Sequence, residues 1–124
     1  MLVWIDRAHA KLFSFEGPEA QKEELHWSHN DHHTHRRGNE DKESAKFYEE
    51  VAHHVARAME VLIVGPGIAK QHFAAFLEQH HPGTRRAVVG VEAIAADLTD
   101  GELRDYGRRY FDRIDRMTGT APLA

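Results

Sequence analysis

The sequence contains no cysteine. This absence excludes disulfide bonds, thiolate nucleophiles and cysteine-ligated zinc sites, and it is typical of proteins from a reducing cytoplasm. The sequence also lacks any apolar run near the roughly 18 residues that a membrane-spanning helix needs. Residues 1–7 have neither a basic region before their apolar run nor small residues for cleavage after it, which is typical of a strand. We therefore expect a soluble, cytoplasmic protein with no membrane partner.

Charge of one sign is not in large excess. The 124 residues carry 16 lysines and arginines, 20 aspartates and glutamates, and a net charge of −4 when the 11 histidines are neutral. Histidines have an unperturbed pKa of roughly 6.5, so a modest fall in pH makes the chain more positive.

The length suits one hydrophobic core. We predict a single domain over residues 1–117 and a flexible tail at 118–124.

Apolar and polar residues alternate in the first part of the chain. Residues 2–5 and 12–15 flank a tight connection and predict a hairpin, and residues 22–27 predict a more polar third strand at a sheet edge. Residues 28–44 are polar, charged and rich in histidine, with almost nothing to bury. This composition predicts a long loop, and long loops in compact domains are often functional.

The second part of the chain alternates helices and strands. Apolar residues at helical spacing predict a first helix over residues 46–59, with Ser44 as its N-cap. Residues 61–64 predict a strand buried on both faces, followed by a sharp turn into a helix that ends at 81–83. Residues 87–91 predict another buried strand, and Thr99 and Glu102 form a capping box that begins the last helix.

These elements predict an α/β fold in the order βββαβαβα. Right-handed crossovers then place helices on both faces of a five-stranded mixed sheet. Ribonuclease H-like and several ribosomal-protein-like domains share this order, so the topology alone does not select a function.

The histidines of the predicted loop could bind metal. His26, His29, His32 and His33 have the short spacing that lets imidazoles converge on zinc or nickel. The loop offers only Asp31 and flexible neighbours to complete and support such a site. We therefore expect weak divalent metal binding here, and no cofactor that the fold requires.

The same segment could instead meet phosphate. Protonated His32, His33 and His35, together with Arg36 and Arg37, would form a cationic tip. Further along, residues 65–70 lead from a buried strand to a helix N-terminus, where backbone N–H groups favour an anion and Lys70 adds charge. This turn lacks the spacing of a P-loop. A solvated loop and a merely sharp turn remain the structural alternatives.

A metal-dependent nuclease of ribonuclease H-like fold is a different possibility. Such enzymes hold two metal ions with carboxylates from the first strand, the first helix and the end of the fourth strand. Asp6 and either Glu49 or Glu50 fit the first two positions, but the fourth strand ends at residues 65–67 without a carboxylate. The constellation is incomplete.

The sequence resembles the central domain of the archaeal and eukaryotic class 1 release factor and Pelota superfamily, and more closely its short bacterial relatives labelled translational machinery proteins. The resemblance covers almost the whole chain, and its most specific block is residues 61–70; residues 2–6, 10–13, 88–92 and 99–103 support it. In true release factors, the resemblance implies a Gly-Gly-Gln tip on the loop after the third strand. Residues 26–44 contain no such motif.

The resemblance therefore implies a Pelota-like, non-catalytic module that associates with the ribosome or RNA. The predicted contacts are His32, His33, His35, Arg36, Arg37 and Lys70. The alternatives are a metal-dependent nuclease or phosphoesterase, and a homo-oligomeric interaction protein that pairs through an edge strand or the aromatic face of the last helix.

Overall fold

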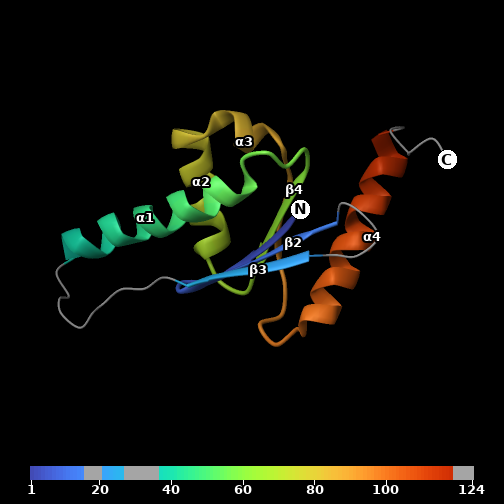
Figure 1. Ribbon diagram of the computed structural model, residues 1–124, viewed down its shortest axis with the longest axis horizontal. Helices are drawn as coiled ribbons and strands as arrows, with labels where there is room; N and C mark the ends of the chain where they lie inside the picture. The colour runs from blue at the N-terminus through green and yellow to red at the C-terminus, as the bar shows by residue number, and fades with distance from the viewer. Residues whose placement is uncertain (16–20, 27–36, 119–124) are drawn as a thin grey trace.

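The computed structural model describes residues 1–15, 21–26 and 37–118. It contains a five-stranded sheet, which lies between the helices in Figure 1. The strand order is β3-β2-β1-β4-β5, with β1 and β2 and also β2 and β3 antiparallel, and β1, β4 and β5 parallel. The α/β fold with a mixed sheet is confirmed. The strands are β1 (Leu2–Ile5), β2 (His9–Ser14), β3 (Gln21–His26), β4 (Val61–Gly65) and β5 (Val88–Ala93).

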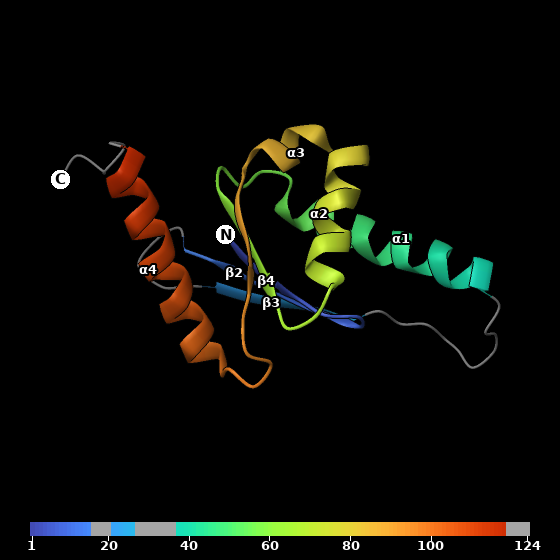
Figure 2. The ribbon, with the colours of Figure 1, turned by 180° about the vertical axis from the view of Figure 1, so that it is seen from behind.

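Helices cover both faces of the sheet, as predicted. In Figures 1 and 2, α1 and α2 lie on one side and α4 lies alone on the other. The short α3 connects α2 to β5. The helices are α1 (Arg37–Val55), α2 (Ala69–His80), α3 (Pro82–Arg86) and α4 (Asp100–Thr118).

The alternation of side chains along β1 divides the core into two layers. Val3 and Ile5 face α1 and α2, where they join a buried cluster that includes Phe73. Leu2 and Trp4 point the other way, into a second cluster with Leu103 of α4. All four residues of β1 are buried because the strand lies in the middle of the sheet and both faces are covered.

The first helix begins earlier than predicted. The loop expected at 28–44 is too long, because α1 starts at Arg37, and Ser44 lies inside the helix rather than at its N-cap. The helix also ends at Val55 rather than at residue 59. Residues 37–46 contain good helix formers but no apolar period, so a search for a buried stripe overlooks them. In Figures 1 and 2 these first turns extend beyond α2.

Two smaller differences concern the region before the last helix. The one-turn helix α3 was not predicted; Pro82 occupies its first turn, where a missing N–H costs nothing. Strand β5 runs from Val88 to Ala93 rather than over 87–91, and its residues are only partly buried because it forms an edge of the sheet.

Polar contacts fix the helices against the sheet. The predicted capping box is present: the Glu102 N–H donates to Thr99 Oγ1 at 3.1 Å, and the Thr99 N–H donates to Glu102 Oε1 at 2.8 Å. Asp100, in the first turn of α4, accepts hydrogen bonds from Lys22 at 2.5 Å and Lys11 at 3.2 Å. The hydrogen bond from Lys22, followed by that from Lys11, lowers the pKa of Asp100. The start of α4 is thereby tied to β2 and β3.

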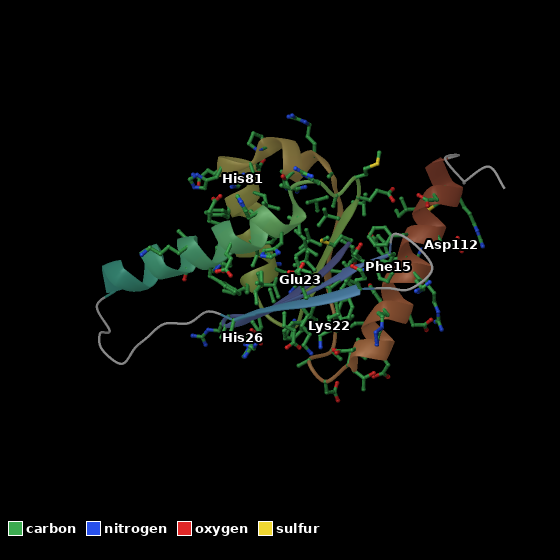
Figure 3. All side chains as sticks on the ribbon, in the orientation of Figure 1. Phe15, Lys22, Glu23, His26, His81 and Asp112 are labelled. Carbon is green, nitrogen blue, oxygen red and sulfur yellow. The ribbon has the colours of Figure 1, made fainter. Side chains whose placement is uncertain are left out.

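Two histidine–carboxylate pairs hold α1. His54 Nδ1 lies 3.2 Å from a carboxylate oxygen of Glu23 on β3, and His81 Nε2 lies 2.8 Å from Glu49 Oε1. Figure 3 labels Glu23 and His81. One end of the helix is thus connected to the sheet edge and its middle to the end of α2. Among the described helices, none is long and apolar enough to cross a membrane.

Candidate nucleic-acid interface

The candidate interface is the end of the sheet at which β1, β3, β4 and β5 finish, which we call the carboxyl edge. These four strands run in one direction and β2 runs in the other, so the turn between β1 and β2 lies at the same edge. Ligands of open α/β sheets characteristically bind outside the carboxyl ends of the strands. The chain that links β3 to α1 also leaves from this edge, after His26.

Two imidazoles lie side by side at this edge. His9 and His26 are cross-strand partners, and their ring centroids are 4.8 Å apart in an edge-to-face arrangement. The side chains remain 50% and 60% exposed. His9 lies 3.4 Å from Asp6, and His26 lies 4.0 Å from Glu24. When both rings are protonated, the pair presents two positive charges to solvent.

The turn that supports His9 is fixed by Asp6. Its Oδ1 atom accepts the backbone N–H of Ala8 at 2.9 Å and of His9 at 2.7 Å. Arg7, at the tip of this turn, is exposed. Asp6 therefore serves as a turn residue in this structure. Of the two carboxylates on α1 considered for a nuclease, Glu49 contacts His81 and Glu50 is exposed.

The turn after β4 lies three strand intervals from His26, which at ~4.8 Å per interval is about 14 Å. Gly65 is required there because a Cβ would overlap the carbonyl oxygen of Ile5 on β1. Gly67 faces open space, and neither glycine has the left-handed backbone that only glycine adopts readily. The turn is thus shaped by the close approach of two strands.

Lys70 occupies an unexpected position. Its side chain is buried, with 7% exposed, and Nζ donates a hydrogen bond to the carbonyl oxygen of Gly67. Helix α2 has neither a side-chain cap nor an acidic residue in its first turn, and Ile68 at its N-cap is 61% exposed. The ammonium of Lys70 therefore braces the turn and adds positive charge beneath the helix N-terminus rather than reaching into solvent.

Most of the residues predicted to contact phosphate or metal lie outside the described ranges. This holds for His29, His32, His33, His35 and Arg36, while Arg37 is the first residue of α1. A divalent metal at His26, His29, His32 and His33 therefore stays a prediction. Within residues 1–15, 21–26 and 37–118, no three histidine, aspartate or glutamate side chains gather closely enough to hold a metal ion.

Sequence reasoning missed the contribution of the turn between β1 and β2. In the sequence, Arg7 and His9 belong to a tight connection between two strands, and only the fold places them at the same edge as His26. The available signal was topological: in a hairpin followed by a third antiparallel strand, the first turn and the end of the third strand meet at one edge.

Comparison with known proteins supports this topology. No protein-family model matches the chain, and no curated protein matches it by sequence. The crystal structure of Pelota from Archaeoglobus fulgidus is similar, with a TM-score of 0.63 at 17% identity, over 96% of this chain and 32% of that one. A structure described as an archaeal protein gives a TM-score of 0.57 at 17% identity, over 96% of this chain and 40% of that one.

The archaeal translation termination factor aRF1 is also similar, with a TM-score of 0.51 at 17% identity, over 96% of this chain and 41% of that one. This chain therefore spans less than half the length of each of these structures. At this identity the likeness is one of fold. The fold is that of a Pelota- and aRF1-like domain, which confirms the resemblance inferred from the sequence.

Proposed function

We propose that this Pelota- and aRF1-like domain is a non-catalytic, translation-factor-like module that binds the ribosome or RNA in the cytoplasm. The observation that carries the proposal is the similarity of fold to Pelota and to a translation termination factor over 96% of the chain. The sequence has no Gly-Gly-Gln motif, so the proposed module does not promote peptide release.

The carboxyl edge supplies the proposed contacts. Arg7, His9 and His26 are exposed there, and the chain that follows His26 carries His32, His33, His35 and Arg36 before Arg37 opens α1. Cationic side chains of this kind neutralise phosphates and release counterions, which makes binding dependent on salt. Lys70 contributes by holding the turn before α2 and by its charge. This arrangement fits a polyanionic partner.

The test is co-sedimentation of the purified protein with ribosomes at low and high salt. We expect the protein to pellet with ribosomes at about 50 mM salt and to remain in the supernatant at about 200 mM. The double variant Arg36→Ala, Arg37→Ala and the double variant His9→Ala, His26→Ala should each reduce the pelleted fraction. The variant Arg113→Ala, Arg116→Ala removes the same number of charges from α4, where Arg113 stacks on Tyr110 and Arg116 pairs with Asp112, and serves as the matched control.

Two results would contradict the proposal. One is a protein that stays in the supernatant at low salt. The other is equal loss of binding in the carboxyl-edge variants and in the α4 control, since that pattern indicates attraction by total charge without a defined interface.

A further inference from the structure

A groove lies at the opposite end of the sheet from the carboxyl edge. Its volume is about 680 Å³, and it lies between the end of α1 and the C-terminal half of α4. The start of β1 and the end of β2 bound it. Figure 3 labels Phe15 and Asp112, which both line it. Its apolar surface includes Phe15, Phe111 and Met59, the last of which is 88% exposed.

Two arginines, one just after α1 and one on α4, line the groove without a carboxylate partner in the described part of the chain. Arg57 follows α1, and Arg108 projects from α4 with its guanidinium 5.6 Å from the ring centre of Phe15. An arginine stacked on an aromatic ring is held in place while its N–H groups stay available. Arg109 also lines the groove, but it pairs with Asp105, and Arg116 pairs with Asp112.

Carboxylates provide acceptors in the same groove. Glu60, Asp112 and Asp115 line it beside the arginines. Burial, and then the neighbouring charge of Asp115, raise the pKa of Glu60. The groove therefore offers guanidinium donors, carboxyl acceptors and an apolar surface within one recess.

We propose that this groove binds a ribonucleotide, with its phosphate between Arg57 and Arg108. Guanidinium groups bind phosphate oxygens in paired, charge-assisted hydrogen bonds. The ribose hydroxyls and the amino groups of the base can donate hydrogen bonds to the carboxyl groups. The base can pack against Met59 and Phe111. The volume lies within the range of about 300–1,000 Å³ that is usual for small-molecule sites.

The mixture of groups favours this ligand over simpler ones. Inorganic phosphate would use the arginines but leave the apolar surface and the carboxyl groups without partners. A long polyanion would place further phosphates beside three carboxyl groups, which is unfavourable. A nucleotide carries one anionic end and one end rich in donors, which matches the groove. The proposal does not depend on the carboxyl edge, because no residue is shared between the two regions.

The test is calorimetric titration of the full chain with AMP, adenosine, inorganic phosphate and a five-nucleotide single-stranded RNA. We expect AMP to bind more tightly than adenosine or phosphate, and Arg57→Ala and Arg108→Ala each to weaken AMP binding by about tenfold or more. Arg113→Ala is the matched control, since Arg113 stacks on Tyr110 of the same helix but does not line this groove. Arg57 is exposed, so its variant should fold normally even if Arg108→Ala does not.

The RNA arm distinguishes the source of the nucleotide. RNA that binds no more tightly than AMP supports a free nucleotide. RNA that binds about tenfold more tightly than AMP would overturn the proposal, because the carboxyl groups of the groove should disfavour further phosphates. Absence of binding by every probe would overturn the proposal, as would phosphate binding as tight as AMP binding or an equal effect of Arg113→Ala. The carboxyl-edge variants change no residue of the groove, so a failure of the ribosome-binding test would not alter the expected AMP binding.

Discussion

The two glycines of the turn after β4 should respond very differently to the same substitution. In Gly65→Ala, the new Cβ would lie under 3.0 Å from the carbonyl oxygen of Ile5, whereas ordinary contacts are 3.4–4 Å. Both atoms belong to backbone, and Gly65 lies at the end of β4, which is hydrogen-bonded to β1. No side chain can rotate away to relieve the overlap, so the two central strands must separate.

The expected loss is at the upper end of the range for overpacking, about 3 kcal/mol of unfolding free energy. Gly67→Ala adds a Cβ that meets nothing within 4 Å, so it should leave stability unchanged or raise it by ~0.4–1 kcal/mol through the unfolded state. Urea denaturation followed by circular dichroism should show the Gly65→Ala midpoint lower by ~1 M or more, given slopes of about 1–3 kcal/mol per molar urea. Equal midpoints for the two variants would refute the argument that strand approach, rather than turn conformation, selects Gly65.

Three further predictions concern α4. Thr99→Ala removes the acceptor for the Glu102 N–H and should cost about 1 kcal/mol in urea denaturation, and a variant as stable as the parent would contradict the capping box. Asp100→Asn should destabilise the protein at neutral pH. Because the folded pKa of Asp100 is lowered, its contribution is present above the unfolded pKa and is lost as pH falls through the folded pKa, so parent and variant stabilities should converge in acid. Gly107→Ala places a Cβ 2.6 Å from Phe15 Cζ and should destabilise, whereas Gly101→Ala meets no atom closer than 3.9 Å and should not; equal thermal midpoints would contradict this.

The parts of the fold that the sequence predicts well are those with local, strongly patterned signals. The apolar run Val61–Gly65 is a buried central strand, and the pair Thr99 and Glu102 forms the capping box that begins α4. The first turns of α1 have no such signal, because a segment whose sequence lacks an apolar period looks like a polar loop. The start of α1 at Arg37 could therefore not be predicted from the sequence.

The candidate sites were less predictable because they depend on contacts between distant residues. The position of Lys70 could be predicted, but not that its ammonium would turn inward to the carbonyl of Gly67. The partnership of His9 with His26 follows from strand register, which the alternation of residues only partly specifies. The groove with Arg57 and Arg108 combines two helices on opposite faces of the sheet, and no spacing in the sequence indicates it.

The central place of β1 also shapes how the chain can reach its native state. Leu2 pairs with Phe13 close by, but its other neighbour, Leu62, lies sixty positions further along the chain. The hairpin can form early, whereas the parallel half of the sheet must wait for a distant segment, which slows assembly. Trp4 and its neighbours then stay uncovered until Leu103 and Tyr110 arrive with α4. Apolar surface that stays exposed until a late segment packs on it favours aggregation and chaperone binding during synthesis.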